Sequence, residues 1–333
     1  MTTEPRRCWR ARLTATRGDK AIQQLIKPLT TLASCLLLAL PQLASAQEKS
    51  AIPASLTTPD KVETRIGTLE FKDGAPSVET ASKVYDTLDF TRALNVFNNS
   101  FRGASAYAIR KGFLSIGAED NTVVIFPDLM DAKSLFLTAN ADTVYYMAVV
   151  DLSKGPMVVE QPPQGLGTIN DMWFSWVIDI GFPGPDRGEG GKYLLLPPGY
   201  DGPLPDGGFF IARAQTTRVL YAARSFLVDN DPKPAVDLIK KSIKIYPYTA
   251  GGVGTSIATA LAGEVRLGRN AAIPETRFVE ASGRVMNTIP PNDYSFFEMI
   301  NENVQQEPAG SYDVELSGQL AAIGIAMASR QVP

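Results

Sequence analysis

The sequence predicts an α+β protein that is mainly β, with an antiparallel β-sandwich or jelly-roll-like core and peripheral helices. The main observation is a β-rich region over residues 121–215, where short apolar runs alternate with Pro, Gly, Asn or Asp. Short strands joined by tight turns favour antiparallel pairing. Helix-like spacing of apolar residues flanks this region on both sides. The expected strands cover residues 123–126, 135–137, 144–151, 157–160, 172–180, 193–196 and 209–213.

The segment before the core is expected to be a loose N-terminus followed by a long helix. Residues 47–75 begin with a stretch rich in Ser, Thr and Pro and continue into a short strand. The helical segment over 76–111 has apolar residues at three- and four-residue steps. This spacing predicts an amphipathic helix of about 25 residues, with a break near Asn98-Asn99 and a weaker helical piece behind it.

Three helices are predicted behind the core. Val236, Ile239 and Ile243 form the apolar face of a helix over residues 231–245. Two C-terminal helices are expected within residues 294–328. No internal repeat is visible, so everything after residue 75 is expected to form a single domain.

Residues 1–46 have the three parts of a cleaved export signal: a basic leader, a short apolar stretch over 29–40, and small residues up to Ala46. The apolar stretch is shorter than the roughly 20 residues that a membrane-spanning helix needs. We therefore predict export to the periplasm, cleavage after Ala46, and no transmembrane segment in the mature form. Lipid anchoring at Cys35 is the alternative, although the most apolar residues follow that cysteine instead of preceding it.

The composition excludes several classes of chemistry. The chain has no histidine, and its two cysteines, Cys8 and Cys35, both lie in the leader. Nucleophile pairs that need His, and the usual zinc, copper or non-haem iron sites, are thereby excluded, and no cofactor is expected. Without the leader, 25 basic and 33 acidic residues remain, and a net charge of 25 − 33 = −8 argues against a nucleic-acid partner.

Two dense runs contain the candidate site residues. In Thr138–Tyr146, alternation on a strand places Asp142 and Tyr146 on one face and Tyr145 on the other, although a structured turn explains Asn140 and Asp142 equally. The second run, Asn170–Trp176, leads into the strand expected over 172–180, and along this segment Asp171 and Trp173 share a polar face with Asp179. Asp171 and Asp179 are about 26 Å apart on one strand, too far for a catalytic pair. Asp142 and Asp171 come from different strands, and the sequence leaves their distance open.

These residues favour a binding or structural module over an enzyme. The expected ligand is a small polar molecule or a carbohydrate-like one, such as a glycan. The alternative is a hydrolase or lyase that uses Asp142, Tyr145 and Asp171 for acid–base chemistry. The glycine-rich loop over 184–193 reads either as a tight hairpin or as an anion cradle beside Lys192. The predicted ligand-binding residues are Asn140, Asp142, Tyr146, Asp171, Trp173 and Lys192.

The two runs and Gly184–Tyr200 together resemble the bacterial domain-of-unknown-function 1254 family. The resemblance implies an exported protein of the cell envelope and gives no mechanism. Longer relatives continue into a second domain of unknown function, number 1214, which we expect this sequence to lack. Apolar residues of the last helix, such as Leu316 and Leu320, are then expected to be exposed and to support a homo-oligomer.

Overall fold

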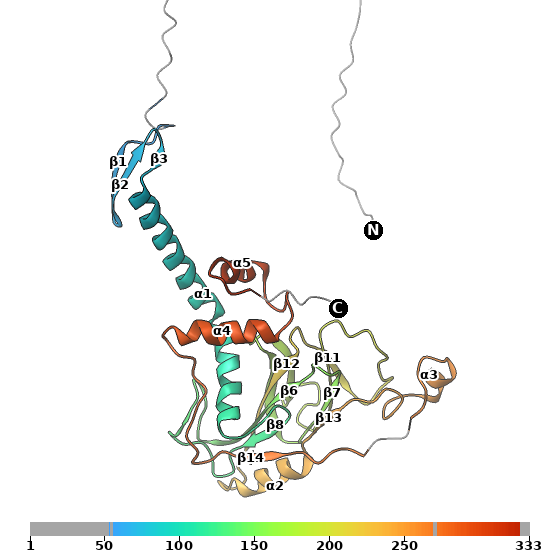
Figure 1. Cartoon of the computed structure of the whole chain (residues 1–333). Helices are drawn as coiled ribbons and strands as arrows, with labels where there is room; N and C mark the ends of the chain where they lie inside the picture. Colours follow the sequence, from blue (N-terminus) through green and yellow to red (C-terminus); the bar gives the residue numbers. More distant parts are fainter. Residues whose placement is uncertain (1–52, 54–55, 269–271, 327–333) are drawn as a thin grey trace, which may run out of the picture. The chain divides into compact units, whose positions relative to one another are not determined.

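The computed structural model describes residues 53, 56–268 and 272–326 (Figure 1). The expected signal peptide, its cleavage site at Ala46 and the lipid-anchor residue Cys35 lie outside the described residues. Residues from Thr58 onward belong to one compact unit. Within the described ranges, no helix is both long and apolar enough to span a membrane.

A small antiparallel sheet precedes a long helix. Strands β1 (Lys61–Thr64), β2 (Gly67–Lys72) and β3 (Ala75–Pro76) form this sheet, and α1 (Val78–Ser115) follows it. Helix α1 begins where the Ser77 hydroxyl accepts a hydrogen bond from the Thr80 amide at 3.1 Å, which satisfies one free donor of the first turn.

The break expected near Asn98-Asn99 is wrong, because α1 continues through it as one helix of 38 residues. Its C-terminal half packs on helices α4 (Ser295–Gln306) and α5 (Val314–Ala322). The Asn99 side chain donates to Gln319 of α5 at 2.8 Å. These tertiary contacts outweigh the weak helix propensity of asparagine.

Two larger sheets form the β-rich part. The first has six strands in the order β14-β4-β6-β12-β8-β9, and the second has four in the order β11-β10-β7-β13. Pairs β14/β4 and β10/β11 are parallel and the others in these sheets are antiparallel. The α+β class is therefore confirmed, with mixed sheets where antiparallel pairing alone was expected. The strand bounds are β4 (Val123–Ile125), β6 (Thr143–Asp151), β7 (Met157–Gln161), β8 (Gly165–Asp171), β9 (Trp176–Gly181), β10 (Gly191–Leu196), β11 (Phe210–Arg213), β12 (Arg218–Phe226), β13 (Lys244–Pro247) and β14 (Phe278–Glu280).

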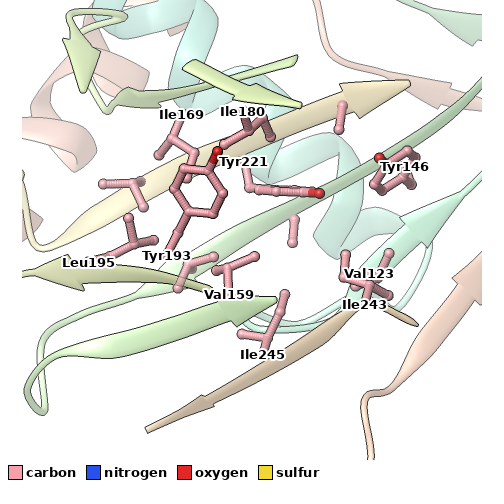
Figure 2. Close-up of a cluster of buried hydrophobic side chains, with 14 of the residues drawn as sticks. Val123, Tyr146, Val159, Ile169, Ile180, Tyr193, Leu195, Tyr221, Ile243 and Ile245 are labelled. Atoms are coloured by element: carbon pink, nitrogen blue, oxygen red, sulfur yellow. The ribbon is translucent and has the colours of Figure 1, made fainter. Parts of the chain in front are cut away.

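The inner faces of these two sheets share one apolar core (Figure 2). Alternate residues of β12, among them Val219, Tyr221 and Ala223, point into it from the middle of the six-stranded sheet. No strand was predicted from the sequence for β12, although β12 lies between β6 and β8 in the sheet. A short parallel pair, β5 (Ser134–Leu135) with β15 (Met286–Asn287), lies apart from both sheets.

The remaining helices cover the core and α1. Helix α2 (Lys233–Ser242) buries Ala235, Val236 and Ile239 in the core shared by the sheets. Leu316 and Leu320 of α5 are buried in a separate cluster with residues of α1 and α4, so the apolar surface expected on the last helix lies mostly inside the unit. Val314 is the exposed exception. Helix α3 (Ile257–Leu261) is a short exposed turn.

Candidate functional site

The two predicted acids, Asp142 and Asp171, lie at opposite ends of the six-stranded sheet. Asp142 precedes Thr143, which pairs with Phe226 at the end of β12. Asp171 pairs with Val219 at the beginning of β12. The two β12 residues are separated by about 23 Å along the strand. The acids therefore cannot act as the carboxylate pair of a hydrolase, which needs roughly 5–9.5 Å between its members.

Asn140 and Asp142 form a local turn. The Asn140 side-chain oxygen accepts hydrogen bonds from the Asp142 amide at 3.0 Å and from the Thr143 hydroxyl at 3.1 Å. Asp142 is exposed, Tyr145 is half-buried on the outer face of the sheet, and Tyr146 is fully buried in the core. This geometry matches the structured-turn alternative and separates Tyr146 from the other predicted ligand-binding residues.

The strand expected over 172–180 is confirmed only for residues 176–180, which belong to β9, because a turn over residues 172–175 separates β8 from β9. Phe174 has a φ of 54°, which reverses the chain and ends the alternation of side chains. The buried Asp171 carboxylate accepts hydrogen bonds from the amides of Trp173 and Ser175, both at 2.8 Å. Burial raises the pKa of Asp171, and these amides oppose that rise. Asp171 therefore stabilises the turn between β8 and β9.

Trp173 is buried, so the expectation that its side chain lies on an exposed polar face with Asp171 is wrong. Its indole nitrogen donates to the Ser311 hydroxyl at 3.2 Å, and its ring packs on Tyr312 with centroids 4.5 Å apart. The turn redirects Trp173 into the cluster beneath α1, α4 and α5. Between the two tryptophans of the described ranges, Trp176 is the exposed one, at 65% exposure.

The glycine-rich loop is organised by its own carboxylate. Asp186 accepts hydrogen bonds from the amides of Gly181 at 2.7 Å and Gly190 at 3.1 Å, and from the Tyr193 hydroxyl at 2.5 Å. Lys192 pairs with Glu160 at 3.3 Å. Because a carboxylate already occupies the loop amides, an anion cradle at this position is not supported.

A cleft beside β13 has a polar part and an aromatic part, and we call it the β13 cleft. Its polar part has a volume of about 430 Å³ and its aromatic part about 290 Å³. Both parts are lined by Pro247, Tyr248 and Pro274, so the two parts adjoin at these residues. Cavities of this combined size are typical of small-molecule sites. None of the residues predicted from the sequence lines either part.

The polar part carries charges of both signs. Its charged lining side chains are Asp120, Asp151, Lys154, Glu275 and Arg277. Asp120 is already held between Arg110 at 2.8 Å and Arg218 at 2.9 Å. Lys154 and Glu275 make no ion pair among the described residues. These two side chains can therefore turn toward a ligand without breaking an internal contact.

The aromatic part lies on the outer face of the four-stranded sheet. Phe209, Tyr246 and Tyr248 pack there over Leu194 and other buried aliphatic residues. The rings of Phe209 and Tyr248 meet edge to face, with centroids 6.0 Å apart. The helix predicted over residues 231–245 includes the start of β13, so the aromatic wall was not predicted from the sequence. The alternation in Lys244–Tyr248 and the helix-breaking Pro247 are the signals that could have revealed it.

A buried ionic cluster adjoins Asp120. Arg218 contacts both Asp120 and, at 3.6 Å, Glu307, which is 2% exposed. Glu307 also accepts hydrogen bonds from the Thr217 amide and, at 2.8 Å, from the Thr217 hydroxyl. Burial raises the pKa of Glu307 to about 7, against the lowering effects of Thr217 and Arg218. No group of three or more acids, histidines or cysteines suited to a metal ion occurs in the described ranges.

Comparisons with known proteins identify a family and no activity. The family model described as "Protein of unknown function (DUF1254)" matches residues 121–247. No curated protein matches the chain. The chain is similar to the crystal structure of the VPA0106 protein from Vibrio parahaemolyticus at 15% identity and a TM-score of 0.47, covering 72% of this chain and about half, 52%, of that one. The resemblance inferred from the sequence runs is confirmed, because the DUF1254 family model matches residues 121–247 of this chain.

Proposed function

We propose that this protein binds a small ligand in the β13 cleft, and that the ligand has an apolar or aromatic face together with several polar groups. Carbohydrates and hydroxylated aromatic compounds have this character. The observation that supports the proposal is the sharing of Tyr248 by the polar and aromatic parts. One ligand of moderate size can therefore contact both. The scaffold we infer is a β-sandwich of the two sheets, exported to the periplasm.

The charges of the cleft favour a neutral or zwitterionic ligand. Lys154 and Arg277 oppose Asp151 and Glu275 on its walls, so no strong potential of one sign is expected. Carboxylates, ammonium groups and backbone groups can instead hydrogen-bond the hydroxyls of a polyol. A few polar groups beside an apolar wall are the usual composition of a small-molecule site.

A hydrolase or lyase is the second candidate, because Glu307 has a pKa near neutrality. A carboxyl with such a pKa can exchange a proton at physiological pH. Glu307 does not line the β13 cleft, however, and its oxygens are engaged by Thr217 and Arg218. We therefore favour binding without turnover.

The test is a binding screen with stated probes. Glucose, N-acetylglucosamine, chitobiose and 4-hydroxybenzoate would be titrated into the protein by ligand-observed NMR. We expect saturable binding of at least one probe, weakened at least 5-fold by Tyr248→Ala because both walls lose a shared residue. Tyr85→Ala, an exposed tyrosine on α1, is the matched control and should leave binding unchanged.

Two outcomes contradict the proposal. Binding that survives Tyr248→Ala would place the ligand elsewhere, and the absence of binding by all four probes at millimolar concentration would remove the carbohydrate and aromatic classes. Conversion of chitobiose to the monosaccharide in the same NMR spectra would favour the enzymatic alternative.

A further inference from the structure

A second pocket, which we call the α2 pocket, lies at another part of the sheets. It has a volume of about 550 Å³ and is bounded by the end of β12, the start of α2, and the residues Gln164 and Phe182 on either side of the β8–β9 hairpin. Its walls are mostly apolar, with Phe226, Val228 and Leu238 among them. It shares no lining residue with the β13 cleft.

The α2 pocket has a buried polar group without a partner. Ser225 is a lining residue of the pocket, and its buried hydroxyl forms no hydrogen bond of normal geometry among the described residues. Ser225 itself is only 3% exposed. A buried hydroxyl without a partner is destabilising, and such groups are rare in native proteins unless a ligand or water satisfies them.

Further polar groups gather beside Ser225 on the inner face of the sheets. Ser225 pairs with Gly165 across β12 and β8. A side chain at Gly165 would collide with the Tyr146 hydroxyl and with the amide nitrogen of Gln161, so both groups lie next to this point. Gln161 donates to Tyr146 at 3.1 Å and accepts from Tyr221. Figure 2 shows Tyr146 and Tyr221 within this part of the core.

The Tyr146 hydroxyl remains protonated and able to donate. Burial raises its pKa, although Ser225, Gln161 and Tyr221 lower it in part. Ser225 is thus close enough to influence Tyr146 without forming a regular hydrogen bond with it. Among the described residues, Tyr146 accepts a hydrogen bond and donates none. Tyr146 is fully buried and does not line the pocket, which leaves Ser225 as the hydroxyl-bearing residue of the pocket wall.

The outer end of the pocket is an aromatic rim. Phe182 and Phe226 are 52% and 53% exposed, and their rings pack with centroids 6.2 Å apart. Large apolar side chains exposed together at the mouth of a cavity are typical of sites that admit apolar ligands. No Lys or Arg lines the pocket. A charged carboxylate would therefore lie buried without a counter-ion, which is strongly unfavourable.

We propose that the α2 pocket is a second binding site, which takes a neutral, mainly apolar molecule with one hydrogen-bond acceptor, such as a ketone or ester carbonyl. The apolar body fills the space between Phe226 and Leu238, and the carbonyl oxygen accepts from the hydroxyl of Ser225. This site is independent of the β13 cleft, and its ligand differs in polarity.

The experiment compares three probes that differ only in the polar group: 2-acetylnaphthalene, 2-ethylnaphthalene and 2-naphthoate. Dissociation constants would be measured by isothermal titration calorimetry. We expect the ketone to bind about 3- to 10-fold more tightly than the ethyl compound, the gain of a typical net hydrogen bond. The carboxylate is expected to bind most weakly. Ser225→Ala should reduce the difference between ketone and ethyl compound and leave the binding of the ethyl compound intact.

Two more variants keep the test decisive. Leu238→Trp narrows the pocket and should weaken both neutral probes at least 5-fold, with folding checked by circular dichroism. Ser82→Ala, at an exposed position of α1, is the matched control for Ser225→Ala. The proposal is overturned if neither neutral probe binds, if Leu238→Trp leaves binding unchanged in a folded protein, or if the preference for the ketone survives Ser225→Ala.

Discussion

Glu307 is predicted to make the stability of this protein fall as the pH rises from about 4.5 toward neutrality. The carboxyl is 2% exposed, and burial raises its pKa from the ordinary 4.5 to about 7. Between these values the folded protein binds a proton that the unfolded chain does not. The contribution of Glu307 to the free energy of unfolding is therefore fully present below pH 4.5, and it is lost as the pH rises to about 7. A difference of this size corresponds to about 3 kcal/mol in the free energy of unfolding.

The assay is urea unfolding followed by circular dichroism at pH 5, 6, 7 and 8. In Glu307→Gln the side chain stays neutral and keeps an oxygen to accept from Thr217, so this variant should lack the pH-dependent loss. The difference between wild type and variant removes the contributions of other acids, among them Asp171, whose pKa is also raised. Glu264→Gln, an exposed glutamate, serves as the matched control and should follow the wild type.

The competing effect in this prediction is the attraction between Glu307 and Arg218, which are 3.6 Å apart. If this attraction dominates, the carboxylate is stabilised in the folded protein, and the wild type gains stability relative to Glu307→Gln as the pH rises. Equal pH dependence in the two proteins would likewise refute the reasoning, because it would mean that the burial of Glu307 does not affect its ionisation.

Three further predictions concern stability and can be checked by the same urea unfolding. Gly103→Ala should destabilise the protein by about 2 kcal/mol or more, because the added Cβ would lie 2.5 Å from the buried Trp173 ring. Asp171→Ala should cost about 1–3 kcal/mol through loss of its two amide hydrogen bonds, and Asp171→Asn, which keeps the acceptor, should cost less. Asp186→Ala should cost more than about 2 kcal/mol, because two loop amides and the Tyr193 hydroxyl lose their partner, and a near-zero effect would contradict this role.

Local sequence patterns were informative where neighbours along the chain decide the structure. Val236 and Ile239 lie on the buried face of α2, and their spacing is visible in the sequence. The motif residues Thr138–Tyr146 and Asn170–Trp176 were sufficient to identify the family. Strand β12 was not predicted because Arg218 and Arg224 interrupt its apolar pattern. Their neighbours Val219 and Ala223 nevertheless point into the core.

The candidate site was predicted in the wrong place for a related reason. Asp171 and Trp173 look like an exposed polar face only if the strand continues through Phe174. The positive φ of Phe174 converts this segment into a turn and buries Trp173 beneath the helices. A conformation of this kind is uncommon for a phenylalanine, so propensity gives little warning of it.

By itself, the sequence determined the α+β class and the resemblance to the family whose model matches residues 121–247, because these depend on composition and on patterns spanning a few residues. The tertiary structure alone decided which side chains meet. The register of β12 against β6 and β8 separates Asp142 from Asp171, and the packing around β13 and α2 creates the two cavities. Pairing between distant strands sets these distances, and the sequence does not encode that pairing in any local pattern.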